Sequence, residues 1–395
     1  MALATVRVPT ERLSEWVAFD GLAQLISVDG QRTVGCPYWD LVADVGAEQL
    51  RDLYRDMAVI RRLDNEAMSL QRQGELGLWA PLLGQEAAQV GSARALRPDD
   101  FAFTSYREHG VAYCRGVDPV GMLRLWRGTA LSGWDPAQFG VSNPAIVVGS
   151  QALHATGYAL GVALDGASSA TLVYFGDGAT SEGDVSEAFG FAASYAVPVV
   201  FFCQNNQWAI SEPVRVQSHT SIAQRGQGYG IPGIQVDGND VLAVLAATRL
   251  ALARAYAGQG PTLVEAVTYR MGPHTTSDDP TRYRSRAEEE LWRAKDPLVR
   301  LRRLLRAERA ADDTFEARVD AAADDAAAAL RAGCLGMADP EPETLFDHVY
   351  AVPHPLLEAE RADYLSYLTE LDDGEFNDHD DHNHDNDDVD EVGLS

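Results

Sequence analysis

The stretch that decides the fold is ATLVYFGDGATSEGDVSEAFGFAASYAVPVVFFCQNN, residues 170–206. Residues 170–175 are apolar and predict a buried strand, and a Gly-Asp-Gly turn follows them. Residues 182–195 carry Ala and Phe at helical spacing, and the apolar run at 197–203 predicts a second strand. A strand–helix–strand unit of this length predicts a parallel crossover, so we expect an α/β protein.

Both strands of this unit are followed by oxygen-bearing side chains. In a parallel crossover the two carboxyl ends meet at one edge of the sheet, where open α/β sheets bind ligands. We therefore expect Asp177 and Asn206 to lie side by side at that edge. A carboxylate, an amide oxygen and nearby backbone carbonyls form a hard oxygen site, suited to a Mg²⁺ ion that holds phosphates. The alternative to a metal site is that Asp177 belongs to an ordinary turn and Asn206 to a polar strand end.

Separate motifs give the chain its resemblance to a known family. The Gly-Asp-Gly turn at 176–178 and the paired asparagines at 205–206 resemble the thiamine-diphosphate fingerprint. The segments GQEA at 84–87, SYREHG at 105–110 and YRMGPHTTSDDPTRYR at 269–284 narrow the resemblance. Together they resemble the alpha subunit of the decarboxylating component of 2-oxo acid dehydrogenase complexes, from about residue 45 to about residue 350.

The resemblance implies the thiamine-diphosphate-binding fold, a doubly wound and mainly parallel sheet with helices on both faces. It implies a catalytic domain at 46–350, preceded by an N-terminal arm at 1–45 and followed by a C-terminal extension at 351–370. The acidic tail at 371–395 is expected to be disordered, because it has little apolar area to bury. Weak binding of a divalent ion by the histidines of the tail is the alternative.

The pattern of apolar residues places the remaining elements. Helices are expected over 47–73, 85–95, 107–115, 150–164 and 240–257. A strand is expected at 262–268, a long polar loop at 270–286 and charged helices over 286–332. The N-terminal arm has a mixed pattern, and we expect it either to cover a partner subunit or to be partly ordered.

The motif match assigns the metal and phosphate ligands. The expected ligands of Mg²⁺ are the side chains of Asp177 and Asn206 and the backbone carbonyl of Trp208. The N–H groups of Gly178 and Ala179 lie near the start of a helix, and we expect them to bind the diphosphate because helix N-termini attract anions.

Further side chains match the cofactor contacts of the family. Tyr106 and Arg107 match its diphosphate clamp, where a planar guanidinium binds phosphate oxygens in pairs; a surface ion pair with Glu108 is the alternative. His274 matches a catalytic histidine near the phosphate and the reaction centre, where it can donate a hydrogen bond in either protonation state; an exposed loop histidine is the alternative. Val148 matches the segment that contacts the aminopyrimidine ring, and an ordinary strand-to-helix junction is the alternative.

The long loop contains four residues that match hydrogen-bonding supports in the family: Arg270, Asp278, Tyr283 and Arg284. Thr275 and Thr276 fall where relatives carry regulatory phosphoserine, and we treat them here as loop residues. Gln204 stands where some relatives have an arginine. Neutralisation of the diphosphate is therefore expected to depend more on Mg²⁺ and Arg107.

The resemblance implies an oxidoreductase that decarboxylates a 2-oxo acid on thiamine diphosphate and passes the acyl group to the lipoyl arm of an acyltransferase. In the family, the glutamate that activates the cofactor lies on the beta subunit. The chain is therefore expected to contribute half of an active site, in a heterotetramer that belongs to a multienzyme complex. The expected cofactors are thiamine diphosphate and Mg²⁺.

The sequence motifs leave three candidate substrates. GIPGIQVDG at 230–238 and GPHT at 272–275 favour pyruvate. GQGYGI at 226–231 and VDGND at 236–240 also resemble enzymes of branched-chain 2-oxo acids, such as 3-methyl-2-oxobutanoate. Acetoin is a third alternative, and Leu78 and Ser105 are candidate selectivity residues.

Composition excludes several classes. The formal net charge of −27 argues against nucleic acid as a partner, because the phosphate backbone would be repelled. Lys295 is the only lysine, so Walker A and lipoyl-carrier sites are excluded. No apolar run is long enough for a membrane span and the first residues lack a signal core, so a cytoplasmic protein is expected. A non-catalytic nucleotide-binding module is a remote alternative, which lacks a Gly-x-Gly-x-x-Gly turn after a strand.

Overall fold

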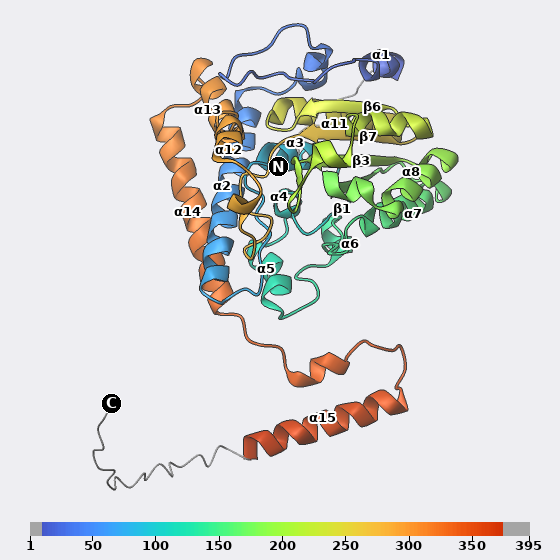
Figure 1. Cartoon of the computed structure of the whole chain (residues 1–395), viewed down its shortest axis with the longest axis vertical. Helices are drawn as coiled ribbons and strands as arrows, with labels where there is room; N and C mark the ends of the chain where they lie inside the picture. The colour runs from blue at the N-terminus through green and yellow to red at the C-terminus, as the bar shows by residue number, and fades with distance from the viewer. Residues whose placement is uncertain (1–9, 374–395) are drawn as a thin grey trace, which may run out of the picture. The chain divides into compact units, whose positions relative to one another are not determined.

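A computed structural model describes residues 10–373, and its centre is a five-stranded sheet (Figure 1). The order across the sheet is β1-β2-β3-β7-β6, and every pair of neighbours is parallel. The strands are β1 Phe101–Phe103, β2 Thr171–Gly176, β3 Val199–Asn205, β6 Gly233–Asp237 and β7 Thr262–Val267. The predicted α/β fold with a mainly parallel sheet is confirmed.

Helices cover both faces of the sheet, which explains why β2 and β3 are continuous apolar runs. Successive side chains of a strand point to opposite faces. Leu172 and Tyr174 pack with α3 (Glu86–Ala93) and α11 (Val241–Tyr256), while Val173 and Phe175 join the opposite core. That opposite core is completed by α7 (Ser150–Leu164) and α8 (Gly183–Tyr195).

The predicted elements are present, with boundaries shifted by a few residues. The helix predicted at 47–73 is α2 (Ala47–Arg72), and the strand predicted at 262–268 is β7. The helix predicted at 107–115 begins later, as α4 (His109–Cys114), because Tyr106 and Arg107 belong to the turn before it. A 3₁₀ turn, η3 (Asp177–Ser181), separates β2 from α8.

Short elements connect these parts. Those of the first half are η1 Thr10–Arg12, α1 Leu13–Val17, η2 Pro37–Val42, α5 Pro119–Arg127 and α6 Pro136–Phe139. Those that follow β3 are β4 Trp208–Ala209, β5 Glu212–Pro213, α9 Val214–Gln217, α10 Ile222–Arg225, η4 Gly226–Tyr229 and η5 Pro280–Arg282.

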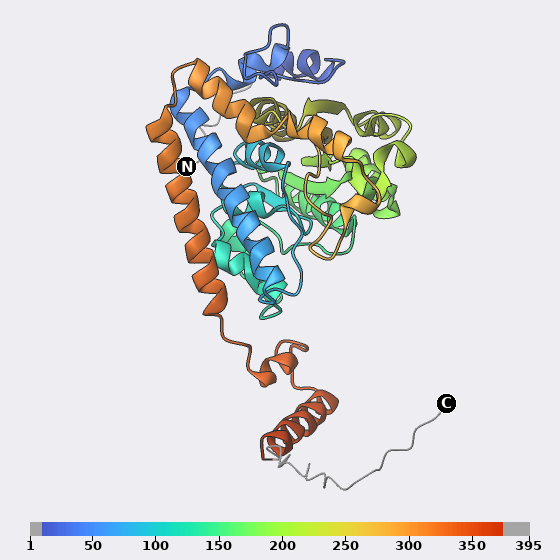
Figure 2. The same cartoon turned by 60° about the vertical axis from the view of Figure 1, so that its left-hand side comes forward.

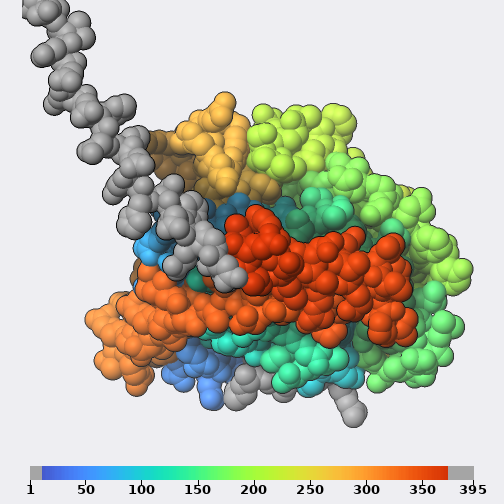
Figure 3. Space-filling model, turned by 90° about the horizontal axis from the view of Figure 1, so that it is seen from below, coloured from blue at the N-terminus to red at the C-terminus, as the bar shows by residue number. Residues whose placement is uncertain are grey.

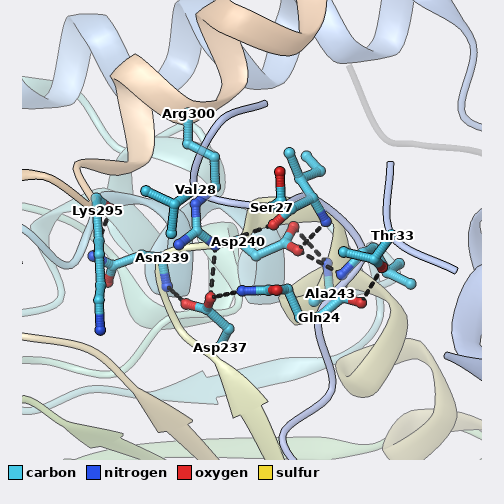
Figure 4. A network of polar contacts seen from close by, with 12 residues as sticks. Gln24, Ser27, Val28, Thr33, Asp237, Asn239, Asp240, Ala243, Lys295 and Arg300 are labelled. Carbon is cyan, nitrogen blue, oxygen red and sulfur yellow. Dashed lines mark hydrogen bonds and ion pairs between the residues drawn. The ribbon is translucent and has the colours of Figure 1, made fainter. Parts of the chain in front are cut away.

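The described part of the N-terminal arm packs on the core of its own chain. Leu13 and Trp16 are buried in the same cluster as α11. Figure 4 shows how the arm is attached to the loop after β6. Asp240 accepts hydrogen bonds from the backbone N–H groups of Leu25 (2.7 Å) and Ile26 (2.6 Å). The arm is therefore a structural part of the fold between residues 10 and 45.

A second anchor joins the end of β6 to the charged helices. Asp237 accepts from Nε2 of Gln24 and from Nη1 of the buried Arg300, each at 2.7 Å (Figure 4). Arg300 belongs to α13 (Pro297–Ala307), which α12 (Arg286–Arg293) precedes and α14 (Asp313–Leu335) follows. Figure 2 shows α14 lying alongside α2.

The chain divides into two compact units after Met337. The domain boundaries at residues 45 and 350 stay predictions. The described part of the second unit contains η6 (Pro342–Phe346) and α15 (Pro355–Asp373), whose surface is red in Figure 3. The predicted acidic tail starts within the last turn of α15, and its remainder, 374–395, lies outside the described residues. Between residues 10 and 373, no helix has the length and apolarity that a membrane span requires.

Candidate active site

A cavity of about 420 Å³ lies at the carboxyl ends of β2 and β3, in the size range of small-molecule sites. It brings together every residue for which the sequence predicted a metal-binding or cofactor-binding role. These are Tyr106, Arg107, Val148, Asp177, Gly178, Ala179, Asn206, Trp208 and His274. The candidate selectivity residues Leu78 and Ser105 line it as well.

Asp177 presents an unpartnered carboxylate oxygen in this cavity. It is the first residue after β2 and is only 1% exposed. Its Oδ2 accepts from Nε2 of Gln217 at 3.3 Å, whereas Oδ1 has no hydrogen-bond partner among the described residues. Burial raises the pKa of Asp177 to about 6. Because a buried charge without a partner is costly, this oxygen fits a cation such as Mg²⁺.

The other two predicted metal ligands also bring oxygen atoms to the cavity. Asn206 follows β3, and its Oδ1 accepts from the backbone N–H of Trp208 at 3.3 Å. Its Nδ2 donates to Oε1 of Gln85 at 3.0 Å. The carbonyl of Trp208 accepts from Nη1 of Arg270 at 3.0 Å, which leaves its second lone pair for another bond.

The turn after Asp177 allows a close approach of two backbone segments. A Cβ atom at Gly178 would lie 2.6 Å from the Cβ of Ala209, so only glycine permits this packing. Gly178 and Ala179 both belong to η3, and both line the cavity. Their N–H groups stand in the first turn after the strand, before the start of α8 at Gly183.

Arg107 is buried, with 5% of its surface exposed. Its Nη1 donates to the carbonyl of Pro81 at 2.6 Å, and its Nη2 donates to the carbonyl of His274 at 3.0 Å. The neighbouring Glu108 is also buried and accepts from Nε2 of Gln204 at 2.5 Å. The alternative reading of Arg107 and Glu108 as a surface ion pair is therefore wrong.

His274 is held in one tautomer by two guanidinium groups. Its Nδ1 lies 3.1 Å from Nη2 of Arg107 and 3.3 Å from Nη1 of Arg270. A guanidinium can only donate, so Nδ1 accepts and the proton is on Nε2. Burial and the two nearby positive charges lower the pKa of His274 to about 3. At neutral pH this residue is therefore a neutral imidazole whose Nε2–H remains available to a ligand.

The predicted hydrogen bonds that order the long loop are present. Asp278 accepts from the backbone N–H of His274 at 2.7 Å and from the hydroxyl of Tyr283 at 2.5 Å. Nη2 of Arg270 donates to the same hydroxyl at 2.8 Å. Arg284 donates to the carbonyl of Arg270. These bonds fix the position of His274 relative to the sheet.

Several polar residues of the cavity received no role from the sequence. Gln85 and Glu108 fall within the GQEA and SYREHG motifs, but neither motif shows where the side chain points. Gln151 lines the cavity from α7. His109 lies outside the lining: its Nε2 is 3.1 Å from the carbonyl of Ala80, and its ring stacks on another aromatic side chain.

The rim of the cavity is apolar where Val148 lies. The exposed fractions of Ile146, Val147 and Val148 are 55%, 71% and 42%. Val148 and Ile146 also line the cavity. Val148 therefore lines the cavity while a large part of its side chain stays exposed.

The carboxyl edge of the parallel sheet brings a buried carboxylate, Asp177, together with the buried guanidinium of Arg107, an arrangement that suits an α/β enzyme with a charged cofactor. Residues 54–330 match the family described as dehydrogenase E1 component, and the chain belongs to this family. This membership confirms the resemblance found in the motifs, and it implies thiamine diphosphate as the cofactor of a 2-oxo acid dehydrogenase component.

Two kinds of curated relatives are similar to the chain. The 3-methyl-2-oxobutanoate dehydrogenase subunit alpha of Mycobacterium tuberculosis is 47% identical over 86% of this chain and 92% of its own length. The pyruvate dehydrogenase E1 component subunit alpha of Staphylococcus aureus is 44% identical over 67% of this chain and 72% of its own length. The corresponding subunit of Staphylococcus epidermidis is 43% identical over 68% and 73%.

Proposed function

We propose that the chain is the alpha subunit of a 2-oxo acid dehydrogenase and binds thiamine diphosphate through Mg²⁺ in the cavity described above. The observation that carries the proposal is that Oδ1 of Asp177 has no partner in the described part of the chain, while Asp177 lines one cavity together with the Arg107–His274 pair. The buried carboxylate of Asp177 fits a cation, and the Arg107–His274 pair fits an anion. A metal diphosphate offers both.

Each residue then has a defined task. Asp177, Asn206 and the carbonyl of Trp208 hold the metal, while Arg107 and the N–H groups of η3 bind the diphosphate. The cofactor supplies the electron sink for decarboxylation when it is bound. The neutral His274 donates its Nε2–H to an oxygen atom of the bound ligand. The guanidinium groups of Arg107 and Arg270 donate to Nδ1 and so keep the proton on Nε2.

We further propose that a beta subunit closes the cavity and that the acyl group passes to a lipoyl-bearing acyltransferase. The exposed apolar rim of Ile146, Val147 and Val148 supports a protein contact, because exposed apolar patches mark interaction sites. The compartment we propose is the cytoplasm.

The sequence motifs favour pyruvate as the substrate. A specific observation favours 3-methyl-2-oxobutanoate as the second candidate: the relative of that name matches a larger share of this chain. Leu78, Trp126 and Ile146 give the cavity apolar walls, which suit a branched side chain.

The test is co-purification with a beta subunit, followed by dye-reduction assays on a panel of 2-oxo acids. We expect turnover in the presence of thiamine diphosphate and Mg²⁺, and none from the isolated chain. The ratio of kcat/KM for pyruvate and for 3-methyl-2-oxobutanoate decides between the two substrates. Substantial decarboxylation by the isolated chain would refute the shared site.

A further inference from the structure

Three buried glutamines line the cavity, each with only one end of its side-chain amide in a hydrogen bond. Gln85, Gln151 and Gln204 are at most 2% exposed. Nε2 of Gln85, Oε1 of Gln151 and Oε1 of Gln204 have no partner within residues 10–373. Buried polar groups of folded proteins are nearly always hydrogen-bonded, so the missing partners of these three atoms indicate that the cavity binds a polar ligand.

The free end of each amide is fixed by its bonded end. A backbone N–H can only donate, so the N–H of Trp208 identifies the Asn206 atom that it contacts as Oδ1. Nδ2 of Asn206 therefore donates to Oε1 of Gln85, and the free atom of Gln85 is the donor Nε2. The relay from Trp208 through Asn206 thus places an N–H group beside the predicted metal ligand.

The same reasoning gives the opposite polarity for the other two glutamines. Nε2 of Gln151 donates at 2.8 Å to the carbonyl of Tyr174, which can only accept, so Oε1 is free. Nε2 of Gln204 donates to a carboxylate oxygen of Glu108 and also leaves its Oε1 free. These two atoms accept from donor groups of a ligand, whereas Gln85 donates to an acceptor.

We propose that Gln85 binds the diphosphate, donating its Nε2–H to a phosphate oxygen next to the metal. This inference rests on the proposed function and deepens it. Gln85 is bonded directly to Asn206, and both residues line the cavity with Asp177 and Arg107. An anionic oxygen is the acceptor that such a site offers, and a hydrogen bond to it is stronger than one to a neutral group.

The test is the substitution Gln85→Glu in the complex with the beta subunit. The glutamate has nearly the same shape and keeps an acceptor for Asn206, but it places a carboxylate oxygen where the free N–H was. We expect the Kd of thiamine diphosphate, measured by calorimetry with Mg²⁺, to rise at least tenfold, which corresponds to ~1.4 kcal/mol. Gln138→Glu, which adds the same charge on the exposed surface of α6, should leave the Kd unchanged.

The ratio of affinities for thiamine diphosphate and thiamine monophosphate separates phosphate recognition from a structural effect. In Gln85→Glu this ratio should fall, whereas a general loss of packing would weaken both ligands alike. If Gln85→Glu does not fold, Gln85→Met provides the same ratio without an added charge. An unchanged ratio in the folded variant overturns the proposal, while a wild-type complex that binds no thiamine diphosphate would instead overturn the proposed function.

Discussion

Replacing Asp177 with asparagine should stabilise the cofactor-free protein while abolishing its Mg²⁺-dependent binding of thiamine diphosphate. Burial raises the pKa of Asp177 from 3.8 to about 6 in the folded protein. Because the folded pKa is the higher one, the stability contributed by this group is fully present below pH 3.8 and is lost as the pH rises through about 6. A shift of about two pKa units corresponds to ~3 kcal/mol. Asp177→Asn buries no charge, so at pH 8 its free energy of unfolding should exceed that of the wild type by up to that amount.

The assay is thermal unfolding of the cofactor-free complex between pH 4 and pH 8, in the presence of a chelator. The melting temperatures of wild type and Asp177→Asn should coincide at the acid end and separate as the pH rises. Asp240→Asn is the matched control. Burial also raises the pKa of Asp240 to about 6, but four backbone N–H groups satisfy its oxygens, so its replacement should destabilise the protein. A lower stability of Asp177→Asn at pH 8 would show that its carboxylate is not an uncompensated charge.

Three further predictions concern the clamp, the histidine and the acidic tail. Arg107→Lys cannot keep all three contacts to Pro81 and His274. The Kd of thiamine diphosphate, measured by calorimetry, should therefore rise about 10- to 100-fold, because a lost charge-assisted hydrogen bond costs roughly 1.5–3 kcal/mol. An unchanged Kd would count against the role of Arg107 in binding the diphosphate. His274→Asn should lower kcat by about 10²–10³, as for the loss of one preorganised donor. In the cofactor-free protein, NMR should show no titration of His274 between pH 5 and 8, since burial and two guanidinium groups lower its pKa to about 3. Deletion of residues 372–395 should leave kcat and the melting temperature nearly unchanged, because so acidic a segment has little apolar area to offset its ordering; loss of complex assembly would contradict this.

The central unit could be predicted because its pattern is local. The alternation of large apolar residues along β2 and β3 fixes which side chains enter each core, and the parallel pairing follows from the helix between the strands. The register pairs Gly176 with Gln204. Asp177 and Asn206, each just beyond its strand, therefore reach the same edge of the sheet, as the crossover required.

What the sequence could not show depends on contacts between distant residues. Gln85 and Asn206 are 121 positions apart, and the direction of each amide follows from the bond between them together with the bond from the N–H of Trp208 to Asn206. The N-terminal arm has no clear period because its order comes from the buried Asp240, more than 200 positions away. Local propensity contains neither relation, and both emerge only when the chain is folded.

The charges of the cavity imply that metal and diphosphate bind together. Arg107 and Arg270 are buried, and their guanidinium groups donate to carbonyls, to His274 and to a tyrosine hydroxyl, all of them neutral. Asp177 is buried, and one of its oxygens has no hydrogen-bond partner among residues 10–373. Either ion alone would neutralise one group and leave the other charge buried, whereas a metal diphosphate matches both signs at once.

Cooperative binding is therefore the expected result in thermal unfolding of the complex. Mg²⁺ alone and thiamine diphosphate with a chelator should each shift the melting temperature by about 1 °C or less, since neither relieves both buried charges. Together, at about 100 times the Kd, they should add ~2.7 kcal/mol of stability, which corresponds to a shift of about 3 °C for a chain of 395 residues. The same experiment on Asp177→Asn should show no cooperativity. Additive shifts from the two ligands in the wild type would mean that the cavity does not couple cation to anion, and would remove the electrostatic basis for placing the metal at Asp177.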